Sequence, residues 1–227
     1  MFWLKVIGGV VYTLLFFGLA LFLPAGTWHW WRAWVFLAVV FVCVMISMVG
    51  ILAHDQALLN ERYKSPIQKG QPLADKIVLL LLVFSFLGLL VFIPLDVFRF
   101  HLLGGPRLII SAAGLALFGI GWAFISAALS ANSFAAPVVK HQEERHQAVI
   151  DSGAYRIVRH PMYAGALPLM IGMPLWLGSW AATVFAIIPA AVLAARIVIE
   201  EQLLRHELPG YEAYTHRVRY RMIPYVW

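Results

Sequence analysis

Long apolar segments alternate with short polar ones along the whole chain. The apolar runs cover residues 4–24, 33–53, 77–94, 108–129 and 162–199. A helix needs roughly 20 apolar residues to cross a hydrocarbon core about 30 Å thick. Each of the first four runs therefore predicts one membrane-spanning helix, and the Trp28, Trp30 and Trp31 cluster after the first run suits the lipid–water interface.

The last apolar run, residues 162–199, is too long for a single crossing. Pro174 and the Gly178-Ser179 pair lie near its middle, and such residues interrupt or end helices. We therefore predict a helical hairpin with arms at 162–177 and 180–199. The fold is then an all-α integral membrane protein with about six transmembrane helices, or five if residues 162–199 form one kinked helix.

Composition excludes the main classes of soluble protein. The 227-residue chain is 62% hydrophobic and 12% charged, with a mean hydropathy of +0.82, whereas soluble domains are about 45–50% apolar and about 25% charged. A single cysteine, Cys43, cannot form an intrachain disulfide. Lys5 precedes the apolar core of the first run, as it would in a signal peptide, but no small-residue cleavage site follows, so that run predicts a retained helix.

The net charge of +6 and the pI near 9.7 raise the question of nucleic-acid binding. The basic residues instead gather between apolar runs, on alternate sides of the predicted membrane. Of 17 Lys and Arg residues, only Arg32, Arg99 and Arg107 fall on the side opposite the termini. By the positive-inside rule, both termini and the long loops are predicted to be cytoplasmic, and no nucleic-acid partner is expected.

The first polar cluster, residues 153–165, lies where the 31-residue connection 130–160 enters the hairpin. Pro161 suits the first turn of a helix, where its missing N–H would have no partner. This places Arg159 and His160 at the helix entrance, where the positive end of the helix dipole favours anions. Tyr163 follows a few residues deeper.

The second polar cluster, residues 196–204, lies where the other arm leaves the membrane. Arg196 and Glu200 share a helix face, and Glu201 points about 100° away. In an antiparallel hairpin both clusters meet at the same membrane surface. Ionisable groups at membrane depth indicate function, although anchoring by snorkelling is the alternative for each residue alone. His141 and His146 have the wrong spacing for a zinc-protease motif, so no metal site is predicted.

The order of these residues resembles the isoprenylcysteine carboxyl methyltransferase family, which includes phospholipid and membrane thiol methyltransferases. The resemblance rests on Gly153-x-Tyr155-x-x-x-Arg159-His160-Pro161-x-Tyr163-x-Gly165, then Glu200-Glu201, Gly210-Tyr211, Tyr214, Arg217-Val218 and Pro224. It covers about residues 108–227. It implies a catalytic core at 108–227, with loop 130–160, hairpin 161–199 and a C-terminal tail, preceded by N-terminal helices and a cytoplasmic loop at 1–107.

The resemblance also implies S-adenosylmethionine as the cofactor, bound at the cytosolic end of the last spans. Carried over by position, the cofactor-binding residues are His146, Val149, Gly153, Tyr155, His160, Pro161, Tyr163, Glu200 and Glu201. Arg159 and Glu201 are the candidate catalytic residues. Arg159 would orient a carboxylate acceptor, and Glu201 would act as a base if the acceptor is an amine.

The expected function is methyl transfer to a lipophilic acceptor: an isoprenylcysteine-like carboxylate, a phospholipid amine or a thiol. The expected setting is multi-pass, in a bacterial inner membrane. The aromatic tail, residues 202–227, predicts a cover over the cofactor, with an interfacial anchor as the alternative. Two other functions remain open, namely an NADPH-dependent membrane reductase of the sterol-reductase type and a non-enzymatic membrane protein. The sequence predicts no oligomeric state.

Overall fold

The computed structural model describes residues 2–54, 71–135 and 147–227 and is built almost entirely of helices. The long elements are α1 (Phe2–Ala25), α2 (Trp31–His54), α4 (Leu73–Leu95), α5 (Leu108–Ala131), α6 (Pro161–Leu177) and α8 (Ile187–Glu207). The short ones are η1 (Asp96–Phe100), η3 (Gly153–Arg156), α7 (Trp180–Phe185) and α9 (Tyr211–Arg217). The described residues contain no named strand, so the all-α prediction is confirmed.

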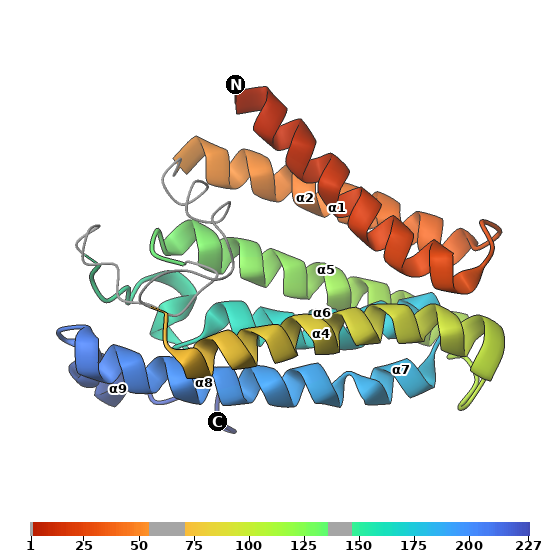
Figure 1. Cartoon of the computed structure of the whole chain (residues 1–227). Helices are drawn as coiled ribbons and strands as arrows, with labels where there is room; N and C mark the ends of the chain where they lie inside the picture. The colour runs from red at the N-terminus through yellow and green to blue at the C-terminus, as the bar shows by residue number, and fades with distance from the viewer. Residues whose placement is uncertain (1, 55–70, 136–146) are drawn as a thin grey trace.

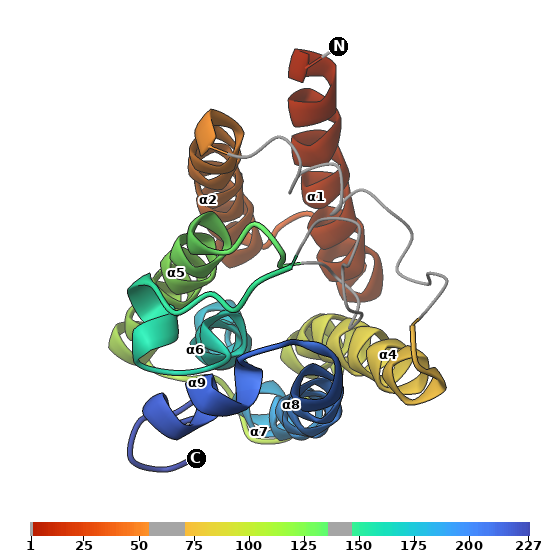
Figure 2. The same ribbon diagram turned by 90° about the vertical axis from the view of Figure 1, so that its left-hand side faces the viewer.

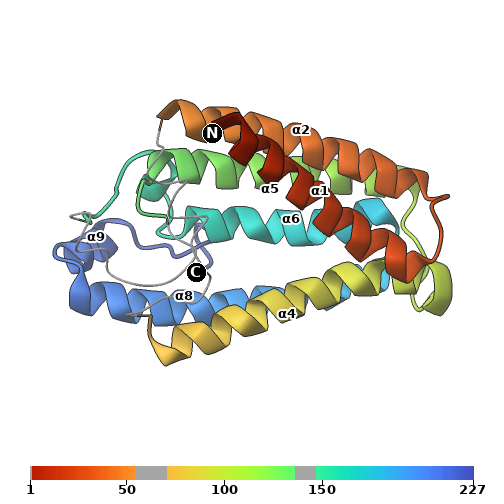
Figure 3. The same cartoon turned by 45° about the horizontal axis from the view of Figure 1, so that its top comes forward.

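The long helices run side by side with their ends at two levels (Figure 1). α9 and the C-terminal tail lie at one end, and the turns before α5 and after α6 lie at the other. Viewed from the α9 end (Figure 2), α6 lies in the centre, surrounded by α5, α4 and α8. α1 crosses obliquely between α2 and α4 (Figure 3). Arg32, Arg99 and Arg107 all belong to the end opposite α9, in agreement with the predicted division of basic residues.

Within the described ranges, five helical segments are long and apolar enough to cross a membrane, namely Ile7–Ala25, Trp31–Met48, Leu73–Phe100, Leu108–Ala131 and Trp180–Glu207. α6 is also apolar but has only 17 residues. The predicted hairpin is present, because the chain reverses at Gly178 (φ +105°), a left-handed conformation that glycine adopts readily. Residues 162–199 are therefore not one kinked helix. α6, which is one arm of the hairpin, is instead shorter than these five segments.

A buried polar cluster fixes the turn of this hairpin. The Ser179 hydroxyl accepts from the Ala182 backbone N–H at 2.8 Å, capping α7, and donates to Asp96 Oδ2 at 2.6 Å. The other Asp96 oxygen accepts from the Leu102 N–H at 2.9 Å. A buried carboxylate needs such partners, and these tie the hairpin turn to the end of α4.

α5 and α6 approach closely because glycines face each other at two levels. Gly121 lies against Gly165, and Gly114 lies against Gly172, in the antiparallel sense. A Cβ built on Gly114 would come within 2.5 Å of Leu175 Cβ, and one on Gly121 within 2.5 Å of the Gly165 carbonyl oxygen. Small residues of this kind let helices associate in membranes, where apolar burial between them gives little driving force. Gly119, on the same helix, meets nothing within 4 Å.

Gly165→Ala is expected to lower the melting temperature by several degrees. The added Cβ would lie 2.7 Å from the Gly121 carbonyl oxygen and 2.8 Å from Ile125 Cγ1. Overpacking of this kind typically costs about 1–3 kcal/mol, more than the roughly 1 kcal/mol that alanine gains over glycine in a helix. Gly119→Ala is the matched control, and thermal unfolding in detergent should leave it unchanged or slightly more stable. Equal melting temperatures for the two variants would contradict the close α5–α6 contact.

Candidate functional site

The C-terminal tail, defined here as residues 208–227, folds back onto the segment before α6. Val158 and Tyr220 form an isolated parallel bridge. The backbone N–H groups of Arg159 and His160 donate to the carbonyls of Tyr220 and Arg221, at 2.9 and 2.8 Å. The fold-back expected of this aromatic tail is therefore present, although the tail forms α9, a short bridge and turns rather than a long amphipathic helix.

A buried ionic cluster joins α6, α8 and the tail. Glu201, only 2% exposed, accepts from Arg159 Nε at 2.6 Å through Oε1 and from Arg221 Nε at 2.9 Å through Oε2. His160 Nε2 lies 3.2 Å from Oε1. Charges are tolerated at such burial only when they are paired and hydrogen-bonded. We call these four residues the Glu201 cluster.

Arg159 also contacts the tail through one of its two terminal nitrogens. Its Nη1 donates to the carbonyl oxygens of Val218 and Arg219, both at 2.8 Å. A guanidinium holds several N–H donors in one rigid plane. This one buried side chain therefore links the Glu201 carboxylate on α8 to the backbone of the tail.

A second polar group lies on the adjacent face of α8. Glu200 Oε2 accepts from the Tyr163 hydroxyl at 2.7 Å. Arg196, one turn earlier, donates from Nε to Asp75 Oδ1 of α4 at 3.2 Å. The predicted shared face of Arg196 and Glu200 is therefore present, and it points toward α4 and α6.

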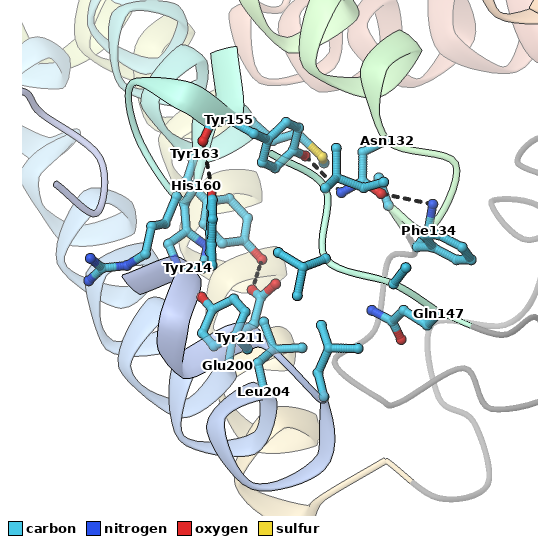
Figure 4. Close-up of a pocket in the computed structure, with 17 residues that line it drawn as sticks. Asn132, Phe134, Gln147, Tyr155, His160, Tyr163, Glu200, Leu204, Tyr211 and Tyr214 are labelled. Atoms are coloured by element: carbon cyan, nitrogen blue, oxygen red, sulfur yellow. Dashed lines mark hydrogen bonds between the residues drawn. The ribbon is translucent and has the colours of Figure 1, made fainter. Parts of the chain in front are cut away.

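A pocket opens between these groups and the tail (Figure 4). Its empty space is about 830 Å³ when the open solvent at its mouth is included. The lining residues are Asn132, Phe134, Ala135, Gln147, Ala148, Val149, Ile150, Tyr155, Arg159, His160, Met162, Tyr163, Glu200, Leu204, Leu208, Tyr211 and Tyr214. The wall thus combines apolar side chains with a few polar groups, which is typical of small-molecule sites.

Three tyrosines of the pocket outside the membrane-spanning helices remain protonated at neutral pH. Burial raises the pKa of Tyr155 to about 12, and burial also raises the pKa values of Tyr211 and Tyr214. The Tyr155 hydroxyl accepts from Asn132 Nδ2 at 3.0 Å, and the Tyr214 hydroxyl donates to the Tyr155 carbonyl at 2.7 Å. Among the residues that the structure describes, Tyr211 Oη finds no hydrogen-bond partner although it is buried. It is a donor without an acceptor at the pocket wall.

The predicted site residues fall into three groups. Val149, Tyr155, Arg159, His160, Tyr163 and Glu200 line the pocket. Glu201, Gly153 and Pro161 are not on its wall: Glu201 lies in the cluster behind it, Gly153 begins η3 with φ +56°, and Pro161 begins α6 as expected. His146 lies outside the described residues.

The structure adds Asn132 to the pocket and places two tyrosines of the aromatic tail on its wall. Asn132 ends the α5 segment and reaches Tyr155, and Tyr211 and Tyr214 project from α9. The spacing of three residues puts both tyrosines on one face of this helix. Asp75 had no local signal, because its partner Arg196 is 121 residues away.

The comparisons with known proteins agree with this geometry. A family model, described as phospholipid methyltransferase, matches residues 109–208. The match begins in α5 and ends after α8, so it contains both polar clusters and most of the pocket wall. A search of curated proteins gives no match. Residues 109–208 therefore match the phospholipid methyltransferase family, part of the isoprenylcysteine carboxyl methyltransferase-like group of membrane methyltransferases.

Proposed function

We propose that the protein is a membrane methyltransferase that uses S-adenosylmethionine and methylates a lipophilic acceptor at the cytoplasmic surface of the membrane. The observation that carries this proposal is the pocket, which places Glu200, Tyr163, His160 and Tyr211 around one space between the family-matched hairpin and the tail. The alternative functions, a reductase and a non-enzymatic membrane protein, have no comparable support.

The residues of the pocket fit the chemical groups of this cofactor. Its amino group or ribose hydroxyls suit the Glu200 carboxylate, and the buried Tyr211 hydroxyl could donate to a further acceptor atom. Aromatic faces at Tyr155, Tyr163 and Tyr214 suit a sulfonium cation. Leu204, Leu208 and Val149 offer an apolar wall for the adenine ring. When bound, S-adenosylmethionine supplies a methyl group activated by its positively charged sulfur.

The protein's part in such a reaction is to position two reactants and exclude water. We assign the Glu201 cluster to positioning, because Glu201 is fully engaged and Arg159 Nε and Nη1 already donate to Glu201 and the tail. Glu200 faces the pocket instead, so it is our candidate for accepting a proton if the acceptor is an amine. A thiolate or carboxylate acceptor would need no base.

The first test is binding of S-adenosylmethionine to the purified protein, measured by titration calorimetry in detergent. Tyr211→Phe is expected to weaken this binding about 3- to 10-fold, since a typical hydrogen bond contributes about 0.5–1.5 kcal/mol. The same variant should keep its melting temperature, because its hydroxyl has no partner among the described residues to lose. Tyr225→Phe, at a tail residue that is 89% exposed, is the matched control and should bind like wild type.

Two results would overturn the proposal. The wild-type protein could give neither heat nor a thermal shift with S-adenosylmethionine or its demethylated product, or it could be stabilised by NADPH alone, which would favour the reductase. Where binding is found, membranes from producing cells incubated with radiolabelled methyl donor should yield labelled lipid, lipidated protein or small-molecule material. The labelled fraction then identifies the acceptor class.

A further inference from the structure

Arg196 lies between two carboxylates that belong to different helices. Its Nε donates to Asp75 Oδ1 at 3.2 Å across the α4–α8 contact. Glu200 is four residues further along α8, close enough for an electrostatic interaction with the Arg196 guanidinium. Side chains at this spacing on a helix readily form ion pairs. Asp75 and Glu200 can therefore compete for Arg196.

In the structure, the Arg196 side chain is hydrogen-bonded to Asp75. Asp75 is completely buried (0% exposed), and its second oxygen accepts from Gln71 Nε2 at 2.6 Å. Glu200 in contrast is half-buried, is bonded to the Tyr163 hydroxyl and lines the pocket. A buried ion pair by itself is weak evidence for stabilisation, because desolvation offsets much of its attraction. The Arg196–Asp75 pair is better explained by its effect on Glu200, from which it keeps the Arg196 guanidinium away.

We propose that Asp75 is a positioning residue that holds Arg196 on α4 and thereby keeps the Glu200 carboxylate open to the ligand. Without Asp75, Arg196 would turn to Glu200, and a cationic or hydroxyl-bearing group entering the pocket would have to displace it. The proposal rests on the proposed function, in which Glu200 binds the cofactor. It gives α4, which lies outside the family-matched residues 109–208, a defined part in the site.

The competition has a simple quantitative form. If only a fraction of the molecules have Glu200 free, the apparent affinity falls by that fraction. Should Arg196 occupy Glu200 about nine-tenths of the time in Asp75→Asn, the dissociation constant for S-adenosylmethionine rises about 10-fold. Removing the competing charge as well, in Asp75→Asn/Arg196→Gln, frees Glu200 again. The double variant should therefore bind within about 2-fold of wild type, a rescue that no purely structural role of Asp75 predicts.

The experiment is titration calorimetry with S-adenosylmethionine on full-length wild type, Asp75→Asn, the double variant and Glu200→Gln. Asp96→Asn is the control, because it neutralises another buried carboxylate at the opposite end of α4 and should leave binding unchanged. Should Asp75→Asn fail to fold, the double variant can still overturn the idea, since weak binding without either charge would contradict it.

The outcomes separate this inference from the proposed function. No binding by wild type would overturn the proposed function. Binding by wild type that is lost in Glu200→Gln but kept in Asp75→Asn would overturn the positioning role alone. A loss in Asp75→Asn that the second substitution fails to restore would also overturn it. The expected pattern is a loss in Asp75→Asn and Glu200→Gln with recovery in the double variant.

Discussion

Glu201→Gln is expected to weaken S-adenosylmethionine binding at least about 100-fold and to lower the melting temperature. The Glu201 carboxylate accepts from Arg159 and Arg221 and lies beside His160. An amide supplies one acceptor oxygen, so one of the two arginines would face an N–H₂ group. Removing one partner of a buried ion pair typically costs about 3–5 kcal/mol, because the other charge stays buried without compensation. The tail, held by the same Arg159, would lose its attachment beside the pocket.

The matched control is Glu212→Gln, on the same side of the molecule. Glu212 pairs with Arg205 and His216, but its side chain is 54% exposed, and exposed pairs contribute about 0–1 kcal/mol. Calorimetric binding and thermal unfolding should leave this variant close to wild type. If Glu201→Gln behaved like Glu212→Gln in both measurements, the Glu201 cluster would have no part in forming the site.

The sequence predicts the hairpin and the meeting of its polar ends well, because both follow from local chemistry. Gly178-Ser179 interrupts a long apolar run, and Pro161 begins a helix wherever the preceding residues allow it. Once the two arms are antiparallel, the residues around His160 and those around Glu201 must arrive at the same end. The observed 3.2 Å between His160 Nε2 and Glu201 Oε1 is the direct consequence.

The local sequence pattern does not predict which of the two adjacent glutamates faces the pocket and which is buried in the ionic cluster. Glu200 and Glu201 differ by about 100° in direction, and which of them faces the pocket depends on where the tail lies. The tail carries Arg221 to Glu201 and Tyr211 to the pocket wall, contacts that only the folded chain brings together. Asp75 is a similar case, since an acidic residue at the start of a helix ordinarily needs no distant partner.

Deleting residues 211–227 is expected to abolish S-adenosylmethionine binding while leaving the transmembrane helices intact. The deletion removes Tyr211 and Tyr214 from the pocket wall and removes the Tyr214 hydrogen bond to the Tyr155 carbonyl. It also removes the Val218 and Arg219 carbonyls that accept from Arg159. The pocket would then be open to water on one side, where hydrogen bonds and charge interactions with a ligand are weakest.

Circular dichroism and thermal unfolding in detergent should show that the truncated chain keeps its helices, because the α5–α6 glycine contacts and the Ser179–Asp96 bond lie away from the tail. Tyr225→Ala changes the tail at a residue outside the pocket wall, so its affinity should equal that of wild type. A lower affinity in the truncated chain than in the Tyr225 variant would then show that the tail itself is needed to enclose the ligand. Wild-type affinity in the truncated protein would refute that role and would leave the tail as an anchor at the membrane surface.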